Sequence, residues 1–503
     1  MIRQKIEKLL KNTVGQEAKI ERPNQTGFGD FSTNIALKTK TNPEKIIEKL
    51  KNNPLFEKIE RAGPGFINFK LSKECLVEEL KEILKKKENY GSLDLGRNKK
   101  VQVEFISANP TGPLTVANAR GGVYGDVLAN VLKKASFQVE KAYYINDCGN
   151  QILVLGHSVL KDQEAQYKGK YIDELHQRIK GDNPEKVGQL AAGRILAGIK
   201  KTVEETGISY DEWISESKLY ESGRVDKVLK LLEKKNLIYN KEGAKWFKST
   251  QFGDNRDRVV VKKDGQKTYL AGDIGFHDYK FNTKKFDKVI NVWGADHHGD
   301  VGGLMAGVEA LGHKGKLKIV LHQFVTLIEK GEKKRMSKRA GICVWLDDLL
   351  KEIGKDALRF FILAKSVNTH INFDLDLAKE QSKQNPVYYI QYAYARICSI
   401  LKKATEHKLQ ISNSEFQAEE LDLIRQLVKF PEIVEDTAKD YQVQRLANYA
   451  LDSANSFHKF YENCRVIDQN NKVDKNRVAL IEAVQTILEN VLDLMGLNAP
   501  EKM

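Results

Sequence analysis

Residues 103–114 read VEFISANPTGPL, and this stretch decides the fold. Apolar and polar residues alternate from Val101 to Phe105, which is typical of a strand with one face against a core. A loop with two prolines follows, and a helix is expected to begin near Thr115. A second strand is expected over residues 138–145, so the pattern predicts a strand–helix–strand unit with parallel strands.

A second unit of the same kind is expected far downstream. It comprises a strand over residues 288–293, a helix over residues 302–311 and a strand over residues 318–324. Between the two units lie about 120 mostly polar residues with helical periodicity, which is too many for a loop. We therefore predict an α/β domain with one doubly wound parallel sheet of Rossmann type and a mostly helical insertion over about residues 155–265.

Two smaller domains are expected to flank this central domain, which would span residues 93–374. Residues 1–92 mix helical periodicity with a strand-like segment, FINF, after a Gly-Pro-Gly turn, which predicts a small N-terminal α+β domain. Residues 375–503 keep helical periodicity almost to the end, which predicts a C-terminal all-α helical bundle. A chain of 503 residues is long enough for three such units.

The composition favours a polyanionic partner. The net charge is +14, which suits nucleic acid, although a solvated lysine-rich surface is the alternative. No apolar stretch approaches the ~20 residues of a membrane span, and the start MIRQKIEKLL lacks an apolar signal core. The five cysteines are scattered without any CxxC, which favours a reducing cytoplasm over a disulfide framework or structural zinc.

Three segments carry residues suited to binding a nucleotide. The helix expected after residues 103–114 would present its first amides to a phosphate, although most such loops bind nothing, and neither a Walker A sequence nor GxGxxG occurs. Residues 331–341, GEKKRMSKRAG, could close cations over a triphosphate, and a solvated basic turn is the alternative. In WGADHHGD, residues 293–300, His297 and His298 should point to opposite faces, which favours nucleotide contact or internal hydrogen bonding over a metal.

Together these segments resemble class I aminoacyl-tRNA synthetases and, more narrowly, arginyl-tRNA synthetase of the bacterial type. The resemblance covers nearly the whole chain. Its further motifs are FGDFSTNIA at residues 28–36, GPGFINF at 63–69, YINDCGNQI at 144–152, DALR at 356–359 and NPVYYIQYAYARICSIL at 385–401. This many motifs in the expected order make a specific match.

The resemblance implies that the chain activates arginine with ATP and Mg²⁺ and then charges tRNA-Arg. It implies an arginine site of Glu104, Ser107, Asn109, Tyr269, Asp273 and Asp296, with Tyr269 and Asp273 gripping the guanidinium. It implies an ATP site of Gly112, Pro113, Thr115, Asn118, Gly294, His297, Arg335, Met336, Ser337 and Lys338. No metal site made by the protein itself is expected.

The chain departs from the family at the start of the helix. The family has histidines at the first and fourth positions, as in HVGH, whereas residues 115–118 read TVAN. Thr115 keeps a hydroxyl donor and Asn118 an N–H donor, so with Lys338 they are the expected catalytic residues of a working variant. Ala117, in place of the glycine, could crowd the adenine.

The resemblance also implies where tRNA binds. The N-terminal domain would touch the corner of the L-shaped tRNA, and the bundle would read the anticodon. The expected contacts are Tyr392, Arg396, His458, Tyr461 and Met503, and bundle core is the alternative for several of the tyrosines at 388–394. A monomer is expected. The rival functions are a catalytically silent paralogue that binds tRNA, a synthetase for another amino acid and a nonspecific basic RNA-binding protein.

Overall fold

A five-stranded parallel sheet forms the centre of the molecule in this computed structural model, which describes residues 1–23, 26–334, 344–404, 416–470 and 472–503. Its strands, in spatial order, are β11 (Leu317–His322), β10 (Lys288–Gly294), β4 (Lys100–Glu104), β5 (Gln138–Ile145) and β6 (Glu212–Ser215). The chain runs outward from β4 through β5 to β6 and then returns to β10 and β11 on the other side. The expected doubly wound fold is confirmed, and its switch point lies between the carboxyl ends of β4 and β10.

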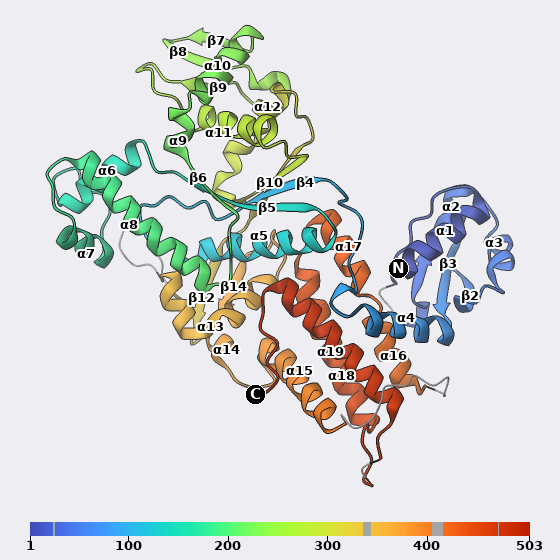
Figure 1. The fold of residues 1–503 in the computed structure, drawn as a ribbon. Coiled ribbons are helices and arrows are strands. Elements are labelled where there is room, and N and C mark those ends of the chain that lie inside the picture. Colours follow the sequence, from blue (N-terminus) through green and yellow to red (C-terminus); the bar gives the residue numbers. More distant parts are fainter. Residues whose placement is uncertain (24–25, 335–343, 405–415, 471) are drawn as a thin grey trace.

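Helices cover both faces of the sheet (Figure 1). On one face, α5 (Val116–Lys134) packs against Val101 and Val103, which belong to the largest hydrophobic core. On the other face, α11 (Tyr269–Asp278) and α12 (Val301–Ala310) pack against β5 through Tyr144. Alternation along β4 sends the buried polar Glu104 to this second face, where α11 lies.

The stretch expected as one insertion, about residues 155–265, is divided by β6, which belongs to the central sheet. Before β6 lie three helices: α6 (Asn150–Leu160), α7 (Lys170–Arg178) and α8 (Pro184–Glu205). After β6 come α9 (Glu216–Glu221), α10 (Arg224–Lys234) and an antiparallel sheet of β7 (Ile238–Lys241), β8 (Ala244–Phe247) and β9 (Arg258–Val261). These strands have four residues each, too short for a clear period-two pattern.

The N-terminal domain has its own small sheet, in the order β1-β3-β2 with antiparallel neighbours. The hairpin of β2 (Phe56–Ala62) and β3 (Phe66–Leu71) turns at Gly63, whose φ of 51° suits glycine. The remaining elements are β1 (Phe31–Thr33), α1 (Ile2–Val14), α2 (Ile35–Thr39), α3 (Pro43–Leu50) and α4 (Lys73–Lys86).

A helical bundle occupies the C-terminal part, as expected (Figure 1). Its helices are α15 (Pro386–Lys403), α16 (Ala418–Leu427), α17 (Phe430–Asp440), α18 (Gln444–Asn463) and α19 (Lys475–Met495). Between sheet and bundle lie α13 (Leu346–Leu363), α14 (Leu375–Lys379) and a small sheet of β12 (Val325–Glu329), β13 (Glu332–Lys333) and β14 (Ile371–Asp374). Among the described helices, none is both long and apolar enough to cross a membrane.

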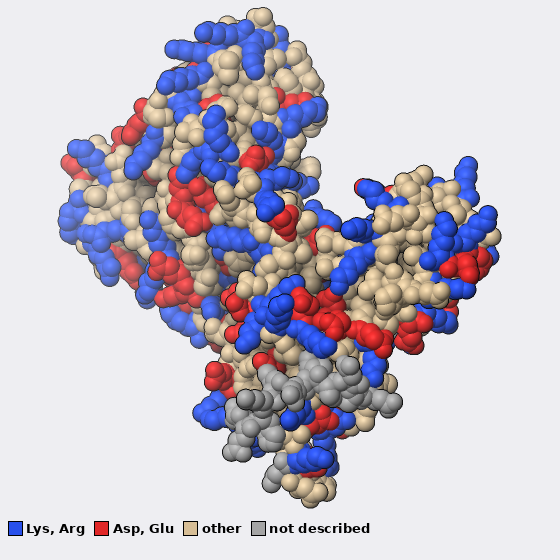
Figure 2. All heavy atoms as spheres, turned by 45° about the vertical axis from the view of Figure 1, so that its right-hand side comes forward, with Lys and Arg blue, Asp and Glu red and all other residues tan. Residues whose placement is uncertain are grey.

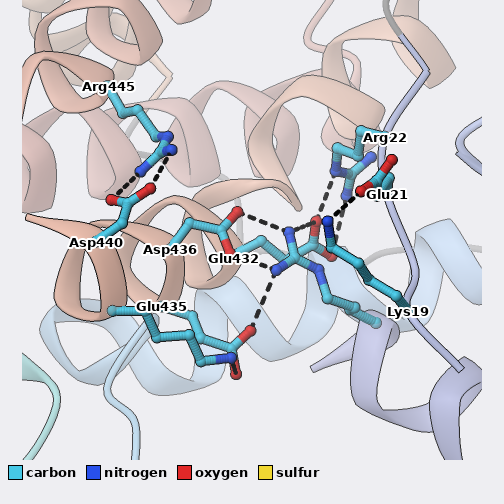
Figure 3. A network of polar contacts seen from close by, with 10 residues as sticks. Lys19, Glu21, Arg22, Glu432, Glu435, Asp436, Asp440 and Arg445 are labelled. Carbon is cyan, nitrogen blue, oxygen red and sulfur yellow. Dashed lines mark hydrogen bonds and ion pairs between the residues drawn. The ribbon is translucent and has the colours of Figure 1, made fainter. Parts of the chain in front are cut away.

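An ion-pair cluster connects the N-terminal domain to α17 of the bundle, and we call it the α17 joint (Figure 3). The Arg22 guanidinium binds both carboxylate oxygens of Glu432, through Nε at 2.7 Å and Nη2 at 3.2 Å. Arg3 from α1 likewise binds Asp436, at 2.5 and 2.9 Å, and lies 3.4 Å from Glu432 and from Glu435. Two arginines of one domain thus pair with three carboxylates of the other.

Candidate functional site

The loop after β4 is strained and firmly held. Ile106 and Ser107 have φ values of 63° and 42°, a left-handed conformation that is unusual for side chains other than glycine, above all for a β-branched residue. The Tyr143 hydroxyl donates to the carbonyl of Ala108 at 2.9 Å. The Ser107 hydroxyl donates to Glu104 Oε1 at 3.1 Å and accepts from the Tyr144 amide at 3.1 Å. Strain of this kind persists where surrounding contacts fix the backbone, commonly at functional sites.

Three carboxylates from three elements gather on the α11 side of the sheet, and we call them the carboxylate pocket. They are Glu104 at the end of β4, Glu216 at the start of α9 and Asp273 on α11. Glu104 and Glu216 are each only 5% exposed. Burial, followed by the charges of Glu104 and Glu216, raises the pKa of Asp273 to about 8. Such a cluster of anions favours a cationic ligand.

Asp273 differs from Glu104 and Glu216 in one respect. Within the described part of the chain, its carboxylate forms no hydrogen bond or ion pair. Glu104 accepts from Ser107 and from the Lys280 ammonium, and Glu216 accepts from the Cys148 thiol at 3.4 Å. A carboxylate that is largely buried and unpaired is costly unless a ligand completes it. Asp273 is therefore the natural partner for a ligand cation.

The remaining expected arginine-site residues are more exposed. Tyr269 is the first residue of α11, one turn before Asp273, and is 67% exposed. Asn109 is exposed in the loop after β4. Asp296 is exposed in the 3₁₀ segment Ala295–Asp300 at the end of β10, where its carboxylate lies 3.8 Å from His297. The structure thus brings Glu104, Ser107 and Asp273 together, whereas Asn109 and Asp296 are exposed in two separate segments.

The expected nucleotide site lies at the start of α5. The amide and the hydroxyl of Thr115 both donate to Asn118 Oδ1, at 2.9 and 3.0 Å. The Thr115 hydroxyl proton is therefore used inside the helix cap, and the residue is 6% exposed. The amide NH₂ of Asn118 then points away from this cap as the donor still available to a phosphate. Gly112 lies in the loop before this helix. A side chain at this position would contact the Tyr171 ring, because a Cβ there would lie 3.4 Å from the Tyr171 hydroxyl.

The residues that follow the basic segment, residues 331–341, lie beside this helix start. Arg335, Met336, Ser337 and Lys338 lie outside the described residues. Before them, the Lys334 amide donates to the Leu327 carbonyl at 2.9 Å. After them, Trp345 pairs with Thr115 as an isolated bridge, and the Leu346 amide donates to the Leu114 carbonyl at 2.8 Å. The chain that leaves the basic segment is therefore attached to the entrance of α5.

Sequence reasoning missed a buried arginine that connects α5 to the chain around the basic segment. Arg120 is 2% exposed and donates to four backbone carbonyls, those of Phe324, Ser366, Val367 and Thr369. Burial lowers the pKa of Arg120 to about 10. Arg120 lies near the start of the helix expected after Thr115, but its partners lie more than 200 positions away, so no local pattern pointed to them.

The aromatic side chains expected to meet tRNA form a cluster on α15 and α18. The Arg396 guanidinium donates to the hydroxyls of Tyr392 and Tyr461, each at 3.1 Å, and stacks 4.7 Å over the ring of Tyr461. The His458 ring stacks parallel to Tyr392. Tyr394 points instead into the bundle core and is 5% exposed, while Met503 at the chain end is 53% exposed.

No group of three or more His, Cys, Asp or Glu side chains suited to a metal occurs within residues 1–23, 26–334, 344–404, 416–470 and 472–503. His297 lies between Asp296 and Asp300, at 3.8 and 3.6 Å, and is 58% exposed.

Comparisons with known proteins agree with these features along the chain. Residues 1–71 match the arginyl tRNA synthetase N terminal domain, residues 79–182 and 192–376 match the catalytic domain of class I tRNA synthetases (R), and residues 390–503 match the DALR anticodon binding domain.

Curated relatives are similar over almost the full length. An arginine–tRNA ligase of Caldanaerobacter subterraneus is 44% identical, covering 97% of this chain and 94% of the relative. The arginine–tRNA ligase of Bacillus subtilis is 42% identical, covering 98% and 97%.

Solved structures share the fold. A putative arginyl-tRNA synthetase from Campylobacter jejuni superposes with a TM-score of 0.79 at 32% identity, over 86% of this chain and all of that chain. The Thermus thermophilus arginyl-tRNA synthetase reaches a TM-score of 0.83 at 23% identity over both whole chains. With three domain matches in order and relatives above 40% identity over nearly all residues, the chain belongs to the arginyl-tRNA synthetase family.

Proposed function

We propose that this chain joins L-arginine to tRNA-Arg by way of an arginyl-adenylate made with ATP. The observation that carries this proposal is the carboxylate pocket at the switch point of the sheet, with Asp273 left unpaired. A guanidinium offers a planar fork of N–H donors that matches a carboxylate, whereas lysine offers a point charge. Asp273 with Tyr269 would hold the guanidinium, and Glu104, with Ser107 and Asn109 nearby, would hold the α-amino and carboxylate end.

The nucleotide would lie between the start of α5 and the end of β10. Gly112, Pro113 and Asn118 would face the phosphates from one side, and Gly294, Asp296 and His297 would border the ligands from the other. The arginine carboxylate attacks the α-phosphate of ATP, and pyrophosphate leaves. Side chains contribute by positioning and by stabilising charge. Lys338 above all, with Arg335, would neutralise charge on the leaving oxygens, and the Asn118 amide would donate a hydrogen bond to them. Met336 and Ser337 of the basic segment would belong to the same nucleotide site. Mg²⁺ enters with ATP as part of the substrate.

The tRNA would bind across three regions. Exposed lysines gather on the module of α10 and β7–β9, which forms the top of the molecule in Figures 1 and 2. The N-terminal domain presents the exposed apolar side chains Phe28, Leu37 and Phe66 near its FGDFSTN and GPGF motifs, which suits stacking on unpaired bases. The cluster of Tyr392, Arg396, His458 and Tyr461, with Met503, would meet the anticodon. We further propose that the chain acts as a monomer in the cytoplasm.

Charging of tRNA-Arg by the purified chain tests this proposal. With ATP, Mg²⁺ and arginine, the chain should charge tRNA-Arg, and lysine should give no product. An Asn118→Ala variant should charge about 100 to 1,000 times more slowly, as for loss of a preorganised donor. Asn130→Ala, also on α5 but beyond the site, is the matched control. Saturable tRNA binding without any charging would instead make the chain a silent paralogue.

A further inference from the structure

A buried lysine lies directly beneath the carboxylate pocket. Lys280 is 0% exposed, and its ammonium donates to Glu104 Oε2 and, over 3.3 Å, to Asn291 Oδ1. It also lies 4.1 Å from the centroid of the Phe276 ring. Burial lowers the pKa of the Lys280 ammonium and the Glu104 carboxylate opposes that shift, so these contacts are the ones that favour the charged form.

The backbone around Lys280 is unusual. The helix α11 ends at Asp278, and the chain continues as a π-helical turn, Tyr279–Thr283. Such turns are rare and occur frequently at functional sites. This turn places the lysine on the same side of the sheet as Glu104 and Asp273.

A neutral histidine fixes the orientation of the other Lys280 partner. The carbonyl of Asp273 accepts from His277 Nδ1 at 2.7 Å, so His277 Nε2 must accept the 3.0 Å bond from Asn291 Nδ2. Burial lowers the pKa of His277 well below its usual value, which keeps this arrangement. The amide oxygen of Asn291 is thereby turned toward Lys280, which leaves the ammonium two fixed acceptors.

The charges of the pocket are unequal without a ligand. Three acidic side chains, Glu104, Glu216 and Asp273, face one basic side chain, Lys280. Glu104 and Glu216 raise the pKa of Asp273, and Lys280 opposes them. Arginine would bring two further cations, its α-ammonium and its guanidinium, and one carboxylate for ATP.

We propose that Lys280 is a positioning residue for arginine: it holds the Glu104 carboxylate in place and supplies the counter-charge that lets Glu104 and Asp273 be ionised together. This inference rests on the arginine pocket of the proposed function. Without Lys280, the charge of Glu104 would act on Asp273 unopposed, so the Asp273 carboxyl would keep its proton to higher pH, and a protonated carboxyl binds a guanidinium poorly.

Other titratable groups face this pair from each neighbouring element. The acidic ones are Glu140 on β5, Glu216 on α9 and Asp300 before α12. The phenols are Tyr144 on β5 and Tyr220 on α9, whose pKa values are raised by burial and stay above the range tested, and His277 on α11 is neutral. Burial also raises the pKa of Glu216, and the pKa of Asp273, at about 8, lies within the range tested.

Calorimetric binding of L-arginine from about pH 6 to about pH 10 tests the proposal through the midpoint of the pH dependence. In the Lys280→Met variant, the midpoint should move up by about one pH unit, with binding about tenfold weaker near neutral pH. In Glu104→Gln, a negative neighbour of Asp273 is lost, so the midpoint should move down although affinity also falls. Comparison with the unaltered chain under the same conditions removes the titration of arginine itself.

Opposite movements of the two midpoints are the signature of a charge role, since a merely structural change would lower affinity without moving them apart. An unmoved midpoint in Lys280→Met, or movement of both in one direction, would overturn the inference. If Lys280→Met does not fold, two other measurements decide the question. The first is the downward movement of the pH midpoint in Glu104→Gln, and the second is the release of protons when arginine binds the unaltered chain. An Asp273→Asn variant that binds arginine normally would instead reject the pocket itself.

Discussion

The α17 joint and the carboxylate pocket both gather acidic side chains, but they differ in what stands opposite them. In the α17 joint, Arg3 binds Asp436 and Arg22 binds Glu432, each with paired N–H donors at 2.5 to 3.2 Å (Figure 3). In the pocket, Asp273 has no such partner among the described residues, and its pKa rises to about 8. In the α17 joint, carboxylates accept hydrogen bonds from guanidinium groups of the chain itself. In the carboxylate pocket, the Asp273 carboxylate is free to accept the same hydrogen bonds from the guanidinium of a bound arginine.

The largest expected effect comes from removing the unpaired charge of the pocket. Asp273→Asn should weaken arginine binding by about 4 kcal/mol, roughly a thousandfold, because the guanidinium loses its charged acceptor in a buried site. The KM for arginine in charging should rise accordingly, while the KM for ATP stays near its original value. The matched control is the same substitution in the α17 joint, Asp436→Asn, which should leave arginine affinity unchanged. Equal effects of the two would break the comparison.

The next effect concerns stability and belongs to the α17 joint. Glu432 is 1% exposed and accepts from both Arg3 and Arg22, so Glu432→Gln leaves two guanidinium groups short of a buried anion. We expect a loss of about 3 kcal/mol of unfolding free energy. Urea unfolding, followed together with arginine binding, would measure it. Arginine affinity that fell as far as stability would show that the joint acts on the pocket and is not only structural.

The third effect is a pH dependence confined to the pocket. Because the pKa of Asp273 is raised in the folded chain, folding binds an extra proton between the usual carboxyl range and about pH 8, and stability falls as pH rises through that window. Arginine requires the ionised form, so its binding should strengthen up to about pH 8, at most about tenfold per unit. The rise in melting temperature caused by arginine should grow with pH. In Asp273→Asn this growth should vanish.

These two regions also show how far sequence alone could reach. The alternation along β4 predicted the strand, and the family motifs named Glu104 and Asp273 for the pocket. Lys280, however, meets Glu104 across 176 positions of sequence, and Arg22 meets Glu432 across 410. Such pairs depend on how domains and strands come together, which no local pattern encodes.

Local chemistry also changed one assignment at the nucleotide site. Sequence reasoning gave Thr115 and Asn118 equal roles as donors, but the helix cap consumes the Thr115 hydroxyl on Asn118 Oδ1. This cap forms between residues only three positions apart, and a threonine followed by an asparagine at that spacing permits it. The same two residue types could equally leave both side chains free to donate to a phosphate. The proline after Phe430 does not interrupt α17, because the first turn of a helix tolerates proline.

The smallest expected effect tests whether burial, rather than the mere presence of a carboxylate, gives the joint its strength. The Asp436 side chain is 34% exposed, and Arg3 keeps Glu432 and Glu435 within 3.4 Å when Asp436 is changed. Asp436→Asn should therefore cost no more than about 1 kcal/mol of unfolding free energy, and added salt should reduce even that, since an exposed pair is screened. Urea unfolding at low and high salt measures both. If Asp436→Asn cost as much as Glu432→Gln, the bidentate geometry of Arg3 on Asp436 would outweigh burial. The unpaired state of Asp273 would then matter more to arginine binding than its depth in the pocket.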